Sequence, residues 1–178
     1  MLHSFFVILV VVQLSTTILS SCKKVVKNDF LIDKSLSTKV GDITANIKVD
    51  TLNFKECYGG QNISQYYAFN DKPYKNGKSH LKEYFVENLN QENFKSFNGL
   101  IRIRFIVNCK GETGRYRIHA MNWKYEKQEL KIKQKSSIIT CLNSYGDFKL
   151  LSNNEFPQNY YFYIILKIEE GLIQELLP

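Results

Sequence analysis

Apolar and polar residues alternate along several stretches of this chain, and this alternation predicts strands. In residues 100–108 every second position is apolar, namely Ile101, Ile103, Phe105 and Val107. A period of two is that of a strand with one buried face. A glycine-bearing turn follows at 110–114, and residues 115–121 alternate again. The two strands and their turn predict a β-hairpin.

Three further strands follow from the same rule. Residues 43–49 alternate, with apolar side chains at Ile43, Ala45, Ile47 and Val49. Residues 159–168 form a strongly aromatic run, and Glu169-Glu170-Gly171 has the composition of a turn. Residues 172–177 then predict a short final strand.

Helical spacing is clearest after Ser79, which can cap the free amide groups of a helix start. Apolar side chains then recur at helical intervals, at Leu81, Tyr84, Phe85 and Leu89. Residues 90–98 are polar and are expected to end the helix.

Residues 123–142 fit two structures. Leu130 and Ile132 alternate with lysines, as in a strand. Apolar side chains also lie along one side of a helix, at Tyr125, Ile132, Ile139 and Leu142. The length of the segment favours a helix, and the strand remains the alternative.

The first 21 residues have the pattern of a secretory signal. Phe5–Val12 is an uninterrupted apolar run that is too short to span a bilayer as a helix. Leu19-Ser20-Ser21-Cys22 follows and resembles the lipobox of bacterial lipoproteins, in which the cysteine is lipidated and becomes the mature N-terminus. Two alternatives stay open: ordinary signal-peptide cleavage near Ser21, and an uncleaved anchor, which the polar Gln13 disfavours.

The residue after Cys22 predicts a location. In bacterial lipoproteins an acidic residue at that position retains the protein at the inner membrane, and Lys23 is not acidic. The resemblance therefore implies a lipid anchor in the outer membrane, on its periplasmic face. Residues 22–39 are polar and without period, so we expect a tether between the lipid and the folded part.

Charge narrows the range of partners. The chain carries 24 Lys and Arg against 17 Asp and Glu, a net charge of +7. The lysines are interspersed with acidic residues, as in 124–127, which indicates a solvated surface rather than a nucleic-acid patch. Export argues further against nucleic acid, so the expected partners are the membrane, through the lipid, and components of the cell envelope.

Three cysteines follow Cys22, and they do not have Cys-x-x-Cys spacing. Buried, inert thiols are the default interpretation of such residues. An oxidising compartment would also permit a disulfide. Cys109 has the parity of the core face of its strand, and Cys141 lies near the end of the helix expected to pack there. A Cys109–Cys141 disulfide is therefore a hypothesis.

The sequence contains no recognisable catalytic or metal-binding pattern. His80 and His119 are the histidines after the leader, and neither has the sequence partners of a triad or a His-x-x-x-His site. We therefore expect no catalytic residues, no metal and no cofactor. Four arginines of the hairpin could form an anion-binding strip or a solvated sheet face, namely Arg102, Arg104, Arg115 and Arg117.

The hairpin and the helix before it resemble the C-terminal domain of TonB. Residues 99–111 are similar to the glycine, alternating strand and "Phe-x-Val-Asn-x-x-Gly" ending of that family. Residues 77–89 look like its preceding helix, and residues 160–168 like its third strand. The resemblance spans residues 79–178 and implies an α+β fold, a small antiparallel sheet with two helices packed on one face. Residues 40–78 would precede it as a strand-rich extension.

TonB proteins offer a sheet edge to an extended segment of an outer-membrane receptor, which is binding by strand addition. The resemblance places the receptive edge on the aromatic strand, at Tyr160, Tyr161, Phe162, Tyr163, Ile164 and Ile165. The same side chains could instead face the core or pair within the sheet.

This chain departs from TonB in lacking an uncleaved membrane helix and a Pro-rich spacer, so we do not expect force transduction. The sequence favours a non-catalytic, lipid-anchored envelope protein that binds an outer-membrane protein or an envelope polymer. The alternative is an envelope enzyme or small-ligand carrier with its site in residues 40–78.

Overall fold

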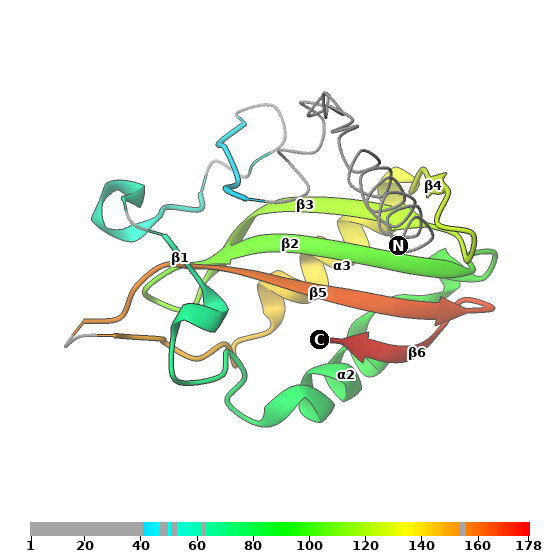
Figure 1. Ribbon diagram of the computed structural model, residues 1–178. Helices are drawn as coiled ribbons and strands as arrows, with labels where there is room; N and C mark the ends of the chain where they lie inside the picture. Colours follow the sequence, from blue (N-terminus) through cyan, green and yellow to red (C-terminus); the bar gives the residue numbers. More distant parts are fainter. Residues whose placement is uncertain (1–40, 47–49, 51–52, 62, 154–155) are drawn as a thin grey trace, which may run out of the picture. The chain divides into compact units, whose positions relative to one another are not determined.

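The computed structural model describes residues 41–46, 50, 53–61, 63–153 and 156–178. The leader, Cys22 and the tether predicted at 22–39 lie outside the described residues. The described part has an α+β fold with two α-helices on one mixed sheet (Figure 1). The helices are α2 (Gly77–Asn88) and α3 (Ile132–Ser144). The strands are β1 (Ser64–Gln65), β2 (Gly99–Val107), β3 (Thr113–Met121), β4 (Lys127–Gln128), β5 (Tyr160–Glu169) and β6 (Leu172–Leu177). Short 3-10 helices lie in the connections, η2 (Cys57–Gly60), η3 (Tyr66–Ala68) and η4 (Gln91–Phe94).

Strand β5 lies inside the sheet rather than at its edge. β2 pairs with it in antiparallel fashion along its length, from Gly99 opposite Ile168 to Val107 opposite Tyr160. β3 and then β4 extend the sheet beyond β2. β1 runs parallel to the first two residues of β5, and β6 runs antiparallel to its second half. Because β2 occupies one edge of β5, β1 and β6 share the other. The sheet is therefore larger than predicted, and it is not wholly antiparallel.

The segments predicted as strands at 100–108, 115–121, 159–168 and 172–177 form strands close to those positions. β2 and β5 begin within a residue of their predicted starts, and β6 has the predicted bounds. The expected alternation places Ile101, Ile103 and Phe105 in the core with no exposed surface. The turn before β6 is formed by Glu170 and Gly171, with φ angles of 50° and 81°. Glycine suits such a position because it has no Cβ to clash.

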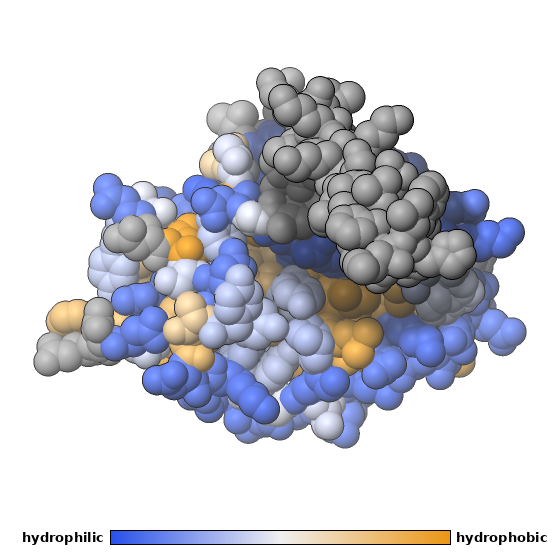
Figure 2. Space-filling model, in the orientation of Figure 1, coloured by the Kyte–Doolittle hydropathy of each residue, from blue (hydrophilic) through white to orange (hydrophobic). Residues whose placement is uncertain are grey.

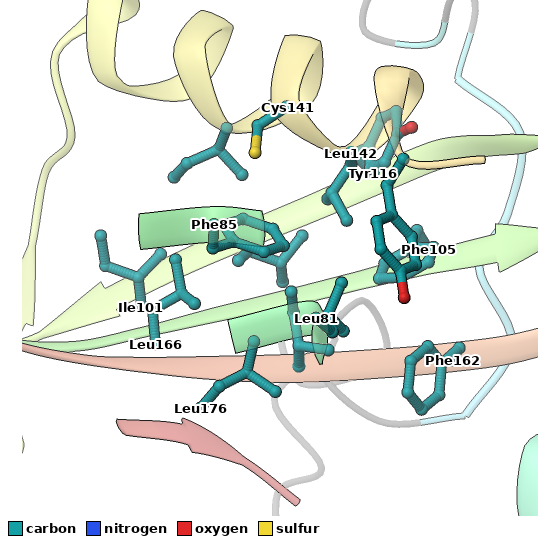
Figure 3. Close-up of a cluster of buried hydrophobic side chains, with 14 of the residues drawn as sticks. Leu81, Phe85, Ile101, Phe105, Tyr116, Cys141, Leu142, Phe162, Leu166 and Leu176 are labelled. Carbon is teal, nitrogen blue, oxygen red and sulfur yellow. The ribbon is translucent and has the colours of Figure 1, made fainter. Parts of the chain in front are cut away.

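The main core lies between the sheet and the two helices (Figure 3). α2 contributes Leu81 and Phe85, and α3 contributes Cys141 and Leu142. They meet the inward-facing side chains of β2, β3, β5 and β6. Full burial of each large apolar side chain contributes roughly 2 to 3 kcal/mol, so this layer provides much of the folding energy.

The helix predicted at 79–89 is confirmed, but Ser79 is not its cap. α2 begins two residues earlier, at Gly77, after the N-cap residue Asn76. No side-chain capping bond forms there. The helical spacing of the apolar residues predicted the helix correctly. The capping residue was a weaker signal, because several polar residues lie before the first apolar position of the helix.

The prediction of one helix across 123–142 is wrong. Residues 127–128 form β4, and α3 begins only at Ile132. The first residues of the segment belong to a turn that closes on Asn122, whose side-chain oxygen accepts hydrogen bonds from the amides of Lys124 and Glu126 at 2.9 and 3.0 Å. The helix is correct for the end of the segment, whereas the strand alternative at Leu130 and Ile132 is also wrong, because the short strand lies earlier, at 127–128.

A second turn has the same construction. The side-chain oxygen of Asn108 accepts bonds from the amides of Lys110 and Glu112, both at 2.9 Å. In both turns the asparagine Nδ2 donates to the glutamate four residues on, at 2.7 Å. Thus Asn108–Glu112 and Asn122–Glu126 share the pattern Asn-x-Lys-x-Glu and close the two ends of β3.

Part of the predicted strand at 43–49 can be compared with the structure. Ile43, Thr44, Ala45 and Asn46 are not in a strand, and residues 47–49 lie outside the described residues. Ile43 is buried, but Ala45 is exposed, so the alternation does not correspond to a buried face. Ile43 instead packs with Ile106 and Tyr161 in a small apolar cluster on the sheet face opposite the helices.

Candidate functional site

The outer edge of β5 is largely covered by the chain's own strands. Tyr160 and Tyr161 pair with β1, and Ile165 pairs with Leu177 of β6. Residues 162–164 lie between them and have no strand partner on this edge within the described part of the chain. The edge predicted to receive a partner is therefore open over a short break only.

The side chains predicted for this edge divide between two faces. Tyr160, Phe162 and Ile164 point into the main core, and Tyr161 is buried on the opposite face. Tyr163 and Ile165 are half-buried. Figure 2 shows the sheet face opposite the helices, where an apolar area lies next to polar side chains. Most of the aromatic side chains of β5 are therefore buried in packing contacts.

A pocket of about 430 Å³ lies beside the break in the β5 edge. It is lined by Tyr66, Lys72, Pro73, Tyr74, Gly77, Lys78 and Pro178. The Tyr66 ring contacts Phe162 at a centroid distance of 5.0 Å, and the Tyr74 ring contacts it at 5.5 Å. The residue before Pro178 is the β6 residue that pairs with Ile165. The pocket therefore opens where β1 and β6 leave β5 uncovered.

The walls of this pocket are held by contacts with a distant segment. The amide of Lys149 donates to the carbonyl of Pro73 at 2.9 Å, and the amide of Lys75 donates to the carbonyl of Asp147 at 3.1 Å. Tyr74 is only 9% exposed. Burial raises its pKa, and its Oη has no hydrogen-bond partner among the described residues. The pocket thus has a rigid aromatic back wall with one unsatisfied hydroxyl.

Two lysines give the pocket a basic rim. Lys72 and Lys78 are both exposed, and neither forms an ion pair with a described residue. The apolar lining and this rim can accommodate an apolar side chain that is followed or preceded by a carboxylate.

β6 is the strand that ends the sheet next to this pocket. It pairs with β5, and its other side faces no strand in the described part of the chain. Gln174 has no register partner in β5, because Glu175 lies opposite Lys167 and Ile173 opposite Ile168. Such a bulge is one of the features by which natural proteins protect an edge.

Three of the four arginines proposed as an anion-binding strip donate to acceptors that the chain itself supplies. Arg104 and Arg117 are opposite each other in the β2–β3 ladder. Arg117 bonds both oxygens of Asp50, at 2.6 and 3.2 Å, and the carbonyl of Thr44 at 2.6 Å. The guanidinium of Arg104 donates to the carbonyl of Gly41.

The other two arginines are also engaged. Arg115 forms an ion pair with Glu56 and donates to the carbonyl of Ile43 at 3.3 Å. Arg102 lies over the ring of Tyr163, 5.3 Å from its centroid. Three of the arginines therefore hold described residues that precede β1, from Gly41 to Glu56, on the outer sheet face, and they are not left as cations for an external anion.

Burial raises the pKa of Asp50, but hydrogen bonds from Arg117 and from the Asn46 amide, together with the nearby arginine charges, outweigh it. The net result is a pKa below the usual range of an aspartate. The carboxylate is therefore ionised at neutral pH and holds Arg117 in place.

The predicted disulfide is wrong, because Cys109 is bonded to Cys57. Asn159, the residue before β5, holds the backbone of Cys57 in place. Its side chain accepts a hydrogen bond from the Cys57 amide at 3.0 Å and donates one to the Cys57 carbonyl at 2.8 Å. Cys141 is a free, buried thiol, and burial raises its pKa to about 12. Parity placed Cys109 on the inner face, but the strand ends at Val107, so its side chain is free to turn toward residue 57.

The histidines are not brought together. His80 lies 3.4 Å from the carboxylate of Asp147, and His119 is opposite Arg102 in the hairpin. Among the residues that the structure describes, no group of three His, Cys, Asp or Glu side chains could hold a metal ion. A search of the same residues finds no helix with the length and apolarity needed to cross a membrane.

Sequence reasoning missed the pocket residues because residues 61–78 have no regular period. The signals present were Pro73 and the two tyrosines Tyr66 and Tyr74. Tyrosine is common in binding surfaces but does not specify one. No family model, curated protein or solved structure matches this chain.

Proposed function

We propose that this protein is a non-catalytic, lipid-anchored component of the cell envelope with a TonB C-terminal-like domain. It binds an extended segment of a protein partner at the β6 edge and in the pocket beside it. The observation that carries this proposal is the meeting of an unpaired strand edge and an aromatic pocket at one end of β6.

Strand addition needs two features. Unpaired backbone groups of an edge strand supply most of the affinity, and a neighbouring pocket selects side chains. Here β6 replaces the predicted β5 as the edge, because the chain folds back after Gly171 and covers Ile165–Glu169. A partner that pairs along β6 past Leu177 would reach the pocket with its next side chain.

Export to an oxidising compartment is supported by the Cys57–Cys109 bond, since disulfides persist there and are rare in the cytosol. The leader and the Leu-Ser-Ser-Cys22 motif support lipid anchoring at the periplasmic face of the outer membrane. An outer-membrane protein is then within reach of the domain.

A second candidate is a small-ligand carrier with its site within residues 40–78. Six of the seven residues that line the pocket come from this segment, namely Tyr66, Lys72, Pro73, Tyr74, Gly77 and Lys78. A concave, mainly apolar pocket with a few polar groups is typical of small-molecule sites.

The test is a pull-down from solubilised envelopes with the full chain as bait, followed by mapping of the captured protein with synthetic peptides. Tyr66→Ala removes a pocket wall, and Tyr67→Ala is its matched control because Tyr67 is 71% exposed and does not line the pocket. Gln174→Pro alters the β6 edge at the residue without a β5 partner.

We expect one short peptide of the captured protein to bind the wild type and the Tyr67 variant, and to bind the folded Tyr66 and Gln174 variants much more weakly. A peptide that binds all four proteins equally would contradict the proposed site. If only the Tyr66 variant lost binding, and the bound species were a small molecule, the result would favour the small-ligand carrier.

A further inference from the structure

A groove of about 780 Å³ separates α2 from α3 on the helical side of the domain. It is larger than the pocket beside β6, and it is formed by different residues. α2 supplies Tyr84 and Asn88, the following turn supplies Asn90 and Asn93, and α3 supplies residues between Ile132 and Ser144. The groove is open to solvent and is lined by residues of both helices and of the connection after α2, which leaves room for a chain that enters and leaves it.

The walls of the groove are fixed. Gln134 is only 6% exposed and donates through Nε2 to the carbonyl of Asn93 at 3.0 Å, which joins α3 to the turn after α2. Its Oε1 accepts from the amide of Lys131 at 2.7 Å. Both helices are held on the sheet by fully buried side chains, among them Phe85 and Ile138. A site with fixed walls loses little entropy on binding.

The lining is rich in neutral groups that both donate and accept hydrogen bonds. Its amide and hydroxyl side chains are Asn88, Asn90, Asn93, Ser136, Ser137, Thr140 and Ser144. Lys133 is the charged residue of the lining, which contains no Asp or Glu. Amides and hydroxyls match sugar hydroxyls, which also donate and accept.

Apolar surface is present as well. The Tyr84 ring lines the groove, and Ile132 is 86% exposed at its edge. A pyranose has one face of C–H groups that packs against an aromatic or aliphatic side chain, while its hydroxyls point to the sides. A partner helix would need an apolar groove, and a nucleic acid or another polyanion would need more than one cation.

We propose that this groove binds a neutral oligosaccharide chain. The site shares no residue with the pocket beside β6, so it stands whether or not the proposed peptide binding is correct. A domain with both sites would contact a protein at its sheet edge and a polysaccharide at its helices.

The test is titration of the isotopically labelled full chain with two neutral oligosaccharides, followed by NMR. One is a hexamer of β-linked N-acetylglucosamine and the other is maltohexaose, so the arms separate acetylated from plain glucans. We expect one of them to shift the amide signals of Asn90, Asn93, Ser137 and Thr140, with a Kd in the millimolar range or below.

Variants separate a specific site from general surface contact. Thr140→Val removes the hydroxyl without changing the shape of the side chain, and Asn90→Ala removes an amide. Each is expected to weaken binding about fivefold, the loss of one net hydrogen bond. Ser79→Ala lies on α2 outside the groove and should bind as the wild type does.

The proposal is overturned if neither sugar at about 10 mM moves the groove signals, a concentration that would fill a millimolar site. It is also overturned if the shifts lie elsewhere, or if both groove variants bind like the wild type.

Discussion

Gly111 and Tyr125 occupy equivalent positions in two turns of the same construction. Both residues have positive φ, 83° for Gly111 and 62° for Tyr125. In each turn the residue lies three positions after an asparagine whose backbone carbonyl accepts its amide, at 2.9 Å for Gly111 and 3.0 Å for Tyr125. Glycine adopts this conformation without strain, whereas a tyrosine pays roughly 1 to 2 kcal/mol for it.

Tyr125→Gly is therefore expected to stabilise the protein. Relief of the left-handed strain exceeds the extra entropy of glycine in the unfolded chain, and Tyr125 loses little packing because it is 77% exposed. We expect a gain of roughly 0.5 kcal/mol in the free energy of unfolding, measured by urea denaturation. The reciprocal change Gly111→Ala should cost about 1 kcal/mol. A stabilising Gly111→Ala would contradict this account of the turns.

The number of free thiols tests both the disulfide and the anchor. Cys57 and Cys109 are bonded to each other, and Cys141 is free. Titration of the denatured, unreduced full chain should therefore find Cys141 alone if the thiol of Cys22 is lipidated. Reactivity of Cys22 as well would show that it carries no lipid on sulfur, and reactivity of Cys57 or Cys109 would contradict the disulfide.

The free thiol of Cys141 should be unreactive in the folded protein. Cys141 is 4% exposed, and burial raises its pKa to about 12, so the reactive thiolate is scarce at pH 8. Iodoacetamide should label it only after unfolding, at a rate that rises with denaturant. Rapid labelling under native conditions, followed by mass spectrometry, would show that the helical layer opens readily.

Removal of the disulfide should destabilise the domain strongly. The bond joins residues 52 positions apart, and closure of such a loop restricts the unfolded chain by about 4 kcal/mol. The Cys57→Ser, Cys109→Ser double variant should lose about this amount in urea unfolding. Reduction of the wild type should have the same effect as the double variant. An equal urea midpoint for the oxidised and the reduced wild type would contradict this stabilising role of the disulfide.

The ion pair of Asp50 and Arg117 predicts a dependence on pH. Because the pKa of Asp50 is lower in the folded than in the unfolded protein, its ionised form stabilises the fold. This contribution is complete above the usual value of 3.8 and is lost as the pH falls through the lowered folded pKa. At pH 7, Asp50→Asn should cost about 2 kcal/mol, since both partners are largely buried.

The difference between wild type and Asp50→Asn should shrink as the pH falls below 3.8. Thermal unfolding at several pH values measures it. Glu169→Gln is a suitable control, because the ion pair of Glu169 with Lys167 is much more exposed than that of Asp50 with Arg117 and should contribute little. A constant difference between wild type and the Asp50 variant across this range would contradict the assigned role.

Sequence reasoning succeeded where a local period coincided with burial. β2, β5 and β6 follow the alternation closely, and the first helix follows its apolar spacing. It failed at residues 123–131, where Lys124 and Glu126 bond to the side chain of Asn122. A helical row of apolar residues does not reveal such a turn, because the turn depends on one side chain and on a positive φ at Tyr125.

The sequence by itself determined the α+β class, the hairpin and the positions of the main strands, because alternation and helical spacing are properties of neighbouring residues. Only the tertiary structure decided which cysteine Cys109 meets, which carboxylate holds Arg117, and which strands cover β5. These contacts join segments far apart in the chain, and their formation depends on how the sheet and helices pack together. Residues without a period, such as Tyr66 and Tyr74, line one pocket only in the folded protein, where Tyr66 follows β1 and Tyr74 is bridged to the distant Phe148.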